Sequence, residues 1–298
     1  MTFPGGVINV LKPPGMTSHD VVSYIRRQYG QKRVGHAGTL DPAAAGVLPV
    51  FLGKATRLIE YFADDDKSYR AEIILGVATD TGDDTGKVLC SQDVIMPETE
   101  ALITALNSFR GRQEQIPPMY SAIKVDGKKM YELARAGITV AREARTIDIS
   151  NIGLIRRLEQ GFSFDVTCSK GTYIRSLCED IGKKLGYPAM MSFLVRTRVG
   201  AFALEQAHTL EEIAVQPLQV LQPADLMLGR LPTICLSAAE FTEMIHGRPV
   251  ICPDTCYPAD ERVRMYDEEK RFVGIGRLVQ SPVNLVLKPE KIMFTDPS

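Results

Sequence analysis

The sequence lacks any apolar run that approaches the roughly 18 consecutive residues needed to cross a membrane. It also lacks internal repeats and low-complexity tracts. Its first ten residues, MTFPGGVINV, have neither the basic start nor the long apolar segment of a signal peptide, so we expect a cytoplasmic protein without membrane attachment. With 45% hydrophobic and 24% charged residues, a chain of 298 residues can bury a sizeable core, and its length suits two domains.

An excess of charge of one sign is also missing. The 35 Lys and Arg residues nearly balance 36 Asp and Glu residues, so the net charge of -1 gives no whole-protein field. A nucleic-acid partner would have to bind local basic patches. Segment 116–145 has six Lys or Arg against three acids, with Tyr120 and Tyr131 among them, and segment 168–198 has six against two. Such segments can hold phosphates and stack bases, although an ordinary solvated face has the same composition.

Metal-binding and nucleotide-binding patterns are missing as well. Of the six cysteines, Cys252 and Cys256 alone approach the spacing of zinc ligands, and no second pair accompanies them. We therefore expect no metal, and reduced, mostly buried thiols. The stretch from Gly46 to Lys54 has too many residues between its glycines for a phosphate loop, and Ala55 replaces the Ser or Thr that would hold magnesium. Without a Gly-x-Ser-x-Gly or His-Glu-x-x-His motif, serine hydrolases and zinc proteases are not indicated either.

The apolar periodicity predicts a mixture of strands and helices. Strands are expected over 7–11, 47–52, 67–75, 145–157 and 162–168, and helices after a Thr17 or Ser18 cap, from Pro97, over 174–185 with a stop at Gly186, and after Thr209. The order is not the regular alternation of parallel βαβ units, which favours an α+β fold with a mixed or antiparallel sheet. After Leu231 the chain changes to one helix over 237–246 and several short strands, so we place two domains at 1–230 and 231–298.

One acid stands out in the motif Gly-His-Ala-Gly-Thr-Leu-Asp-Pro, residues 35–42. Gly35 and Gly38 allow the backbone to bend sharply or to approach a ligand closely. Four basic residues and no acid separate Asp20 from Asp41. Asp41 is thus a candidate catalytic carboxylate, but it is equally suited to cap a short helix over 42–45 with Pro42 at its first position.

A second cluster, Cys-Ser-Lys-Gly-Thr-Tyr-Ile-Arg over 168–175, lies at a predicted junction between a strand and a helix. Free backbone N–H groups at such a junction suit an anion. Tyr173 and Arg175 flank the apolar stripe at about 100° on either side of Ile174. An arginine in that position can pair with a buried carboxylate and stabilise its charge, whereas the simpler interpretation is an ordinary surface arginine.

The motif GHAGTLDPAAAGVLPV (35–50) resembles the catalytic motif of TruB-type tRNA pseudouridine synthases, which make pseudouridine-55 in the T-loop. The similarity extends, in order, through 12–18 (KPPGMTS), 66–76 (DKSYRAEIILG), 117–135 (PPMYSAIKVDGKKMYELAR) and 168–177 (CSKGTYIRSL). It therefore covers nearly all of residues 5–215. Five motifs in the expected order are far more specific than any one of them.

The resemblance implies an α+β fold with a pseudouridine-synthase core, in which 116–145 is an inserted RNA-clasping element. Residues 231–298 then resemble a small PUA-like β domain that binds RNA, although this segment has eight Lys or Arg against ten acids. The implied activity is the isomerisation of uridine in the T-arm of tRNA, without cofactor or metal, by a monomer that needs no protein partner. Two alternatives remain: a tRNA-binding folding chaperone, and the subunit of a guide-RNA-dependent ribonucleoprotein.

The resemblance also assigns the site residues. It makes Asp41 the catalytic carboxylate and leaves open whether that group attacks C1′, adds to C6 or removes the C2′ proton. It implies that Arg175 pairs with Asp41 and that Tyr69 packs on the target base. It further implies that Tyr173 and Leu194 line the substrate pocket and that His36 stabilises the flipped-out base.

Overall fold

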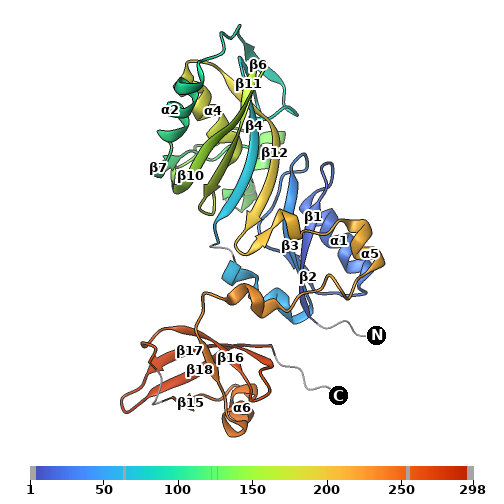
Figure 1. The fold of residues 1–298 in the computed structure, drawn as a ribbon, viewed down its shortest axis with the longest axis vertical. Coiled ribbons are helices and arrows are strands. Elements are labelled where there is room, and N and C mark those ends of the chain that lie inside the picture. The colour runs from blue at the N-terminus through green and yellow to red at the C-terminus, as the bar shows by residue number, and fades with distance from the viewer. Residues whose placement is uncertain (1–4, 63–64, 122, 126, 253–255, 294–298) are drawn as a thin grey trace.

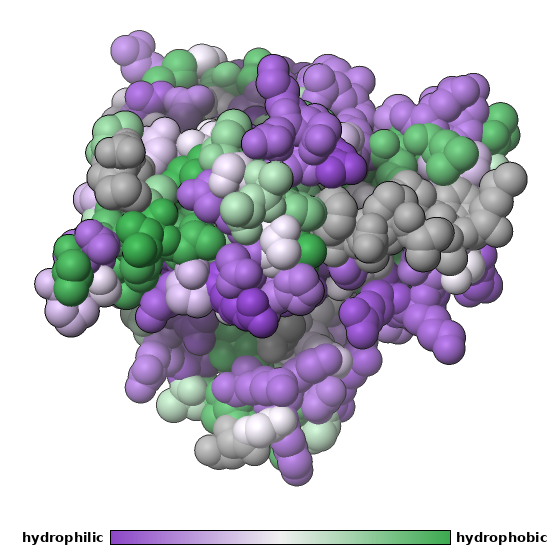
Figure 2. Space-filling model, turned by 90° about the horizontal axis from the view of Figure 1, so that it is seen from below, coloured by the Kyte–Doolittle hydropathy of each residue, from purple (hydrophilic) through white to green (hydrophobic). Residues whose placement is uncertain are grey.

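The computed structural model describes residues 5–293 except 63–64, 122, 126 and 253–255 (Figure 1). The start of the first predicted domain, the end of the second and two positions of the predicted insertion therefore lie outside the described residues. Figure 1 shows a larger body built on one sheet and a smaller body below it, formed by the last part of the chain. Seen from the smaller body, the surface is mainly hydrophilic, with apolar patches between the polar side chains (Figure 2).

A nine-stranded sheet organises the larger body. Its order is β1-β3-β12-β4-β11-β10-β7, with β2 on β3 and β13 on β12. Among the described strands of this sheet, β3 and β12 form the one parallel pair, which confirms a mixed, largely antiparallel sheet. The strands are β1 (Gly6–Lys12), β2 (Val34–His36), β3 (Ala45–Leu52), β4 (Lys67–Leu75), β7 (Gly111–Gln115), β10 (Arg145–Leu158), β11 (Gly161–Cys168), β12 (Ala189–Val199) and β13 (Phe202–Ala203).

Two short hairpins extend from this sheet. One consists of β5 (Val77–Thr79) and β6 (Val88–Ser91), and the other of β8 (Lys124–Val125) and β9 (Lys128–Lys129). Residues 80–87, part of a Gly- and Asp-rich stretch (79–87) whose composition is typical of a turn, connect β5 to β6.

The strand that the sequence pattern missed is central. β12 lies between β3 and β4, although no strand was predicted over 189–199. The end of β12 carries Arg196, Thr197 and Arg198, and such polar residues are not typical of a buried strand. Arg196 is nevertheless buried in the protein interior. By contrast, the alternation over 67–75 is confirmed by β4, whose Tyr69, Ala71, Ile73 and Leu75 are all buried.

The helices of the larger body include the four predicted from the sequence, each of which begins within two residues of its expected start. They are α1 (Ser18–Gln28), α2 (Thr99–Asn107), α3 (Met130–Arg135), α4 (Ile174–Leu185) and α5 (Leu210–Val215). Thr17 and Thr209 cap α1 and α5 through capping boxes with acids three residues later, and Gly186 ends α4 at a φ of 85°. Short 3-10 helices cover Gly53–Phe62, Leu204–Gln206 and Ala224–Leu228. No helix among the described residues is long and apolar enough to cross a membrane.

Helices α2 and α4 lie together on one face of the large sheet (Figure 1). The apolar side of α4 packs with β4, β11 and β12 into one core that also contains Leu40 and Tyr69. The first turn of α4 is thereby held close to the loop between β2 and β3.

The smaller body confirms the predicted C-terminal β domain. Its five strands have the order β14-β16-β17-β18-β15 and surround their own apolar core with α6 (Ala238–Ile245). The strands are β14 (Thr233–Cys235), β15 (Val250–Ile251), β16 (Arg262–Tyr266), β17 (Phe272–Gln280) and β18 (Leu285–Ile292). It contacts the 3-10 helix over 53–62: Arg57 Nη1 donates to the Ile292 carbonyl at 2.9 Å, and Lys291 Nζ lies 2.7 Å from Glu60 Oε1.

Candidate active site

Asp41 and Arg175 form an ion pair at the end of the loop between β2 and β3. The distance from Arg175 Nε to Asp41 Oδ2 is 3.0 Å. The other nitrogens of the arginine donate to the backbone carbonyls of Thr81 (Nη1, 2.9 Å) and Tyr120 (Nη2, 2.8 Å). With every nitrogen engaged, the guanidinium has one orientation, and it presents a fixed positive charge to the Asp41 carboxylate.

The two partners of this pair differ in exposure. The Arg175 side chain is 6% exposed, whereas the Asp41 side chain is 41% exposed. The predicted pairing is therefore present, but the arginine is the buried member and the carboxylate is open to solvent. A substrate can reach Asp41 without any rearrangement of the protein core.

The alternative role of Asp41 as a helix cap is wrong. Residues 42–45 form no helix: the Asp41 carbonyl accepts from the Ala44 N–H at 3.1 Å in a single turn, and β3 begins at Ala45. The sheet captures this segment because β3 pairs with β1 on one side and with β12 on the other.

A second carboxylate lies near Arg175. Asp83 Oδ2 is 3.8 Å from Arg175 Nε, and this side chain is 12% exposed. Its other oxygen, Oδ1, accepts hydrogen bonds from the hydroxyls of Thr81 and Thr85, both at 2.6 Å, and from the Thr85 N–H at 3.1 Å. The composition of residues 79–87 (TDTGDDTGK) predicts no more than a turn, and Asp83 was not among the predicted site residues. The available signal was its acid-rich composition.

Tyr69 forms an inner wall of the site. It faces Arg196 in the register of β4 and β12. Burial raises the pKa of Tyr69 above its ordinary value, so the hydroxyl stays protonated at neutral pH. Leu194 lies beside Tyr69 in the same apolar core, and both are buried. Tyr69 and Leu194 thus belong to the same apolar core as Leu40, the residue before Asp41.

Arg196 is a buried cation that holds the loop before Asp41. Its side chain is fully buried, and it donates to the carbonyls of Val47 (2.8 Å), Gly38 (3.0 Å) and Thr39 (3.4 Å). A buried charge of this kind is tolerated because the carbonyl dipoles replace its lost hydration.

Lys12 does the same for the segment after Asp41. Its ammonium is buried and donates to the carbonyls of Pro13 (2.9 Å), Pro42 (3.2 Å) and Ala44 (2.6 Å). Burial lowers the pKa of Lys12 to about 8, and the nearby Asp41 carboxylate opposes that shift. The backbone on both sides of Asp41 is thus fixed by two cations from β1 and β12, neither of which was a predicted site residue.

His36 lies at the end of β2 and is half-buried. It forms no ion pair with Asp41 within the described part of the chain, and its Nδ1 is buried without a hydrogen-bond partner there. Burial, followed by the charge of Arg196, lowers the pKa of His36, so the ring is neutral at pH 7. Tyr173 precedes the first residue of α4, is half-buried, and is two residues from Arg175.

The two basic segments differ in the structure. In 116–145 the cations are mostly exposed, and Lys129 and Arg135 lie 5.4 and 5.5 Å from the centre of the Tyr131 ring. In 168–198 the expectation of one phosphate-binding patch is wrong for Arg175 and Arg196, because both are buried and bonded to protein groups.

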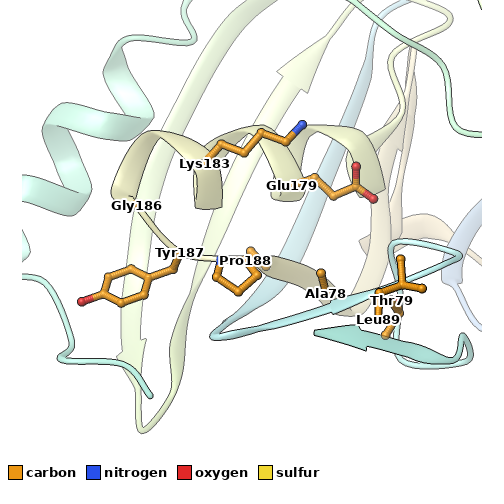
Figure 3. Close-up of a pocket in the computed structure, with 9 residues that line it drawn as sticks. Ala78, Thr79, Leu89, Glu179, Lys183, Gly186, Tyr187 and Pro188 are labelled. Carbon is orange, nitrogen blue, oxygen red and sulfur yellow. The ribbon is translucent and has the colours of Figure 1, made fainter. Parts of the chain in front are cut away.

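A separate cavity of about 580 Å³ lies where α4 faces the β5–β6 hairpin (Figure 3). Glu179 and Lys183 project from α4 above it, and Tyr187 and Pro188 follow the helix along its lower side. Burial raises the pKa of Glu179. Asp41 is not among the residues that line this cavity, so the ion pair is not part of it.

The six cysteines differ in exposure. Among the residues that the structure describes, no group of three or more His, Cys, Asp or Glu side chains is placed to hold a metal ion. Cys168 and Cys178 are buried, but Cys90, Cys235 and Cys256 are exposed, so the expectation of mostly buried thiols is wrong. Cys90 and Cys235 lie on β6 and β14, which have solvent-facing positions.

Known protein families match the chain along most of its length. The model described as TruB family pseudouridylate synthase (N terminal domain) matches residues 26–174. The tRNA pseudouridylate synthase B C-terminal domain matches 175–228, and the C-terminal model of pseudouridine synthase II TruB matches 232–290.

Similar proteins have the same name in several bacteria. The tRNA pseudouridine synthase B of Alkaliphilus oremlandii is 46% identical over 277 residues, which are 91% of this chain and 92% of that protein. The enzyme of the same name from Symbiobacterium thermophilum is 51% identical over 245 residues, 81% of this chain and 82% of that protein. Among solved structures, a chain of a Cbf5-Nop10-Gar1 complex has a TM-score of 0.75 at 28% identity, with 97% of this chain and 85% of that chain covered.

Proposed function

The chain belongs to the TruB family of pseudouridylate synthases, and on that premise we propose that it isomerises uridine to pseudouridine at position 55 in the T-loop of tRNA. The reaction breaks the N1–C1′ bond of the nucleotide and joins C1′ to C5 of the same base. It changes no oxidation state, so the protein has to supply a positioned carboxylate, a base-binding wall and the means to extrude the target base.

The observation that carries the proposal is the half-exposed carboxylate of Asp41 beside the buried Arg175. We assign to Asp41 the role of nucleophile or base toward the ribose or the ring, and to Arg175 the role of holding that carboxylate in place. A rigid cation that is held through each of its three nitrogens needs no reorganisation during the reaction.

The neighbouring residues provide the remaining functions. Tyr69 packs on the target base and, because it stays protonated at neutral pH, it can donate a proton or a hydrogen bond. Leu194 and Tyr173 line the pocket, and His36 acts beside the extruded base as a neutral ring. The exposed cations of 116–145 position the RNA backbone.

We further propose that the protein acts alone, as a cytoplasmic monomer, with 1–230 as the catalytic domain and 231–298 as an auxiliary RNA-binding domain. Its similarity to proteins named tRNA pseudouridine synthase B exceeds its similarity to chains from Cbf5 complexes, which favours direct recognition of tRNA over a guide RNA. A role as a folding chaperone alone would give no use to the fixed Asp41–Arg175 pair.

The test is tritium release from [5-³H]uridine-labelled T-arm RNA by the purified protein. The wild type is expected to release tritium without any added RNA or protein. Asp41→Asn is expected to fall below about a hundredth of the wild-type rate while its RNA affinity is retained, because affinity comes from many phosphate contacts. Asp93→Asn, which changes an exposed aspartate, is the matched control. Turnover by Asp41→Asn at the control rate contradicts the assignment.

A further inference from the structure

The side chain of Gln115 holds both backbone groups of Tyr173. Gln115 Nε2 donates to the Tyr173 carbonyl at 3.0 Å, and Gln115 Oε1 accepts from the Tyr173 N–H at 2.8 Å. Gln115 is 4% exposed. Because the two bonds use opposite halves of the amide, a flipped amide would set donor against donor and acceptor against acceptor. The orientation of this side chain is therefore unique.

Tyr173 is the point from which α4 starts. It is the N-cap residue, with φ of -100° and ψ of 113°, and it makes no capping bond with its own side chain. Its carbonyl also accepts from the Leu177 N–H at 3.0 Å, which begins the helix. Gln115, on β7, thus fixes the backbone of the N-cap residue from outside the helix. The guanidinium that pairs with Asp41 is only two residues further along, at Arg175.

The rest of the segment after Gln115 also crosses this end of α4. Ser176 Oγ donates to the Ile116 carbonyl at 3.2 Å, and Arg175 Nη2 donates to the Tyr120 carbonyl at 2.8 Å. Gln115 itself is the last residue of β7, at the edge of the large sheet, where it faces Arg145 of β10. Segment 116–145 therefore leaves the sheet and returns to it at this pair.

We propose that Gln115 is a positioning residue for the reaction: it fixes Tyr173 and the first turn of α4, and so aligns Arg175 on Asp41. The inference rests on the proposed function. Gln115 lies where the RNA-clasping segment 116–145 leaves the sheet. A displacement of the backbone at Gln115 would therefore also shift Arg175. An apolar side chain would fill the same space, but it would leave the two backbone groups of Tyr173 without partners.

Two nearly isosteric variants separate positioning from packing. Gln115→Glu keeps an acceptor for the Tyr173 N–H, but its second oxygen faces the Tyr173 carbonyl and has a hydrogen to donate only when it is protonated. Gln115→Met removes both bonds at every pH. Gln92→Glu makes the same chemical change at an exposed position and serves as the control.

The first readout is the single-turnover rate at saturating enzyme, measured between pH 5.5 and 8.5 and divided by the wild-type rate at each pH. Both Gln115 variants are expected to lose at least about tenfold at pH 8.5, since small misplacements of a catalytic group are costly. As the pH falls, Gln115→Glu is expected to recover by about fivefold or more through protonation, whereas the Gln115→Met ratio stays constant. RNA affinity is expected to stay within about twofold of the wild type, because phosphate contacts are untouched.

The second readout needs no activity. In the ¹⁵N-labelled protein without RNA, the Nε–H resonance of Arg175, assigned by its absence in Arg175→Lys, is expected to shift in both variants and to return in Gln115→Glu at low pH. An unchanged resonance, or a loss of rate whose ratio does not depend on pH in either variant, overturns the proposal. A wild type that releases no tritium contradicts the proposed function instead, and the resonance still decides the role of Gln115.

Discussion

Arg175 is the buried partner of Asp41, and it is held by four oxygen atoms from three different segments. Its Nε faces the carboxylates of Asp41 at 3.0 Å and Asp83 at 3.8 Å, while its terminal nitrogens bind the carbonyls of Thr81 and Tyr120. The cation is therefore part of the scaffold, and the exposed carboxylate is the group that is free to meet a substrate. This asymmetry separates Arg175 from the other basic residues of α4.

Arg175→Met is expected to lower the single-turnover rate on T-arm RNA by about 100-fold, because a preorganised charge next to the reacting carboxylate is lost. Lys183→Met and Lys184→Met, further along the same helix, are the matched controls and are expected to stay within about twofold, since exposed charges contribute little. Comparable small losses for all three variants would show that Arg175 acts as one more phosphate contact.

His36→Ala is expected to slow the reaction more on a closed T-loop than on a flexible uridine-containing oligonucleotide. Extruding a base costs a few kcal/mol, and least when the base is already unstacked. Because burial lowers the pKa of His36, the ring is neutral across the working range, and wild type and variant should share the same pH profile above pH 6.5. The measurement is the single-turnover rate of both proteins on both RNAs. An equal loss on the two RNAs would remove the role in extrusion.

RNA binding is expected to weaken steeply with salt despite the net charge of -1. Each phosphate that the protein neutralises adds roughly 0.7 to 0.9 to the negative slope of log affinity against log salt. Lys128→Met, in the exposed basic segment, is expected to reduce that slope by about one. Lys87→Met is the control, because Lys87 stands alone among six acids over residues 80–100. A flat plot for the wild type would contradict the basic-segment interpretation.

Glu179→Gln is expected to stabilise the protein at high pH. The folded-state pKa of Glu179 is raised above its ordinary value of 4.5, mainly by burial beside the cavity in Figure 3. The folded protein therefore binds this proton more tightly than the unfolded chain, and stability is lost as the pH rises above that value. At pH 8 the variant should gain about 1 to 2 °C in Tm, since the carboxylate is partly solvated.

At pH 4 the Glu179 side chain is mostly protonated in both the folded and the unfolded protein. The difference in Tm between Glu179→Gln and the wild type should therefore vanish. Glu159→Gln, at an exposed turn, is the control and should have no effect at either pH. Thermal unfolding followed by circular dichroism gives both values. A stabilisation that is equal at pH 4 and pH 8 would exclude the burial of this charge as its cause.

The sequence by itself determined the elements that depend on local patterning. The alternation over 67–75, the caps at Thr17 and Thr209 and the stop at Gly186 are encoded by side chains close to the structure they specify. The motif around Asp41 identified the family in the same way, because its residue types alone are distinctive.

The tertiary structure alone decided which cations hold the site and which remain available to a ligand. Arg196, Lys12 and Arg175 bind backbone carbonyls of distant segments, and Gln115 binds the backbone of Tyr173. Every residue has a backbone carbonyl, so the pattern of side chains cannot indicate which carbonyls will bind a buried cation. For the same reason β12, with arginines near its end, was recognised as a strand only when its neighbours were in place.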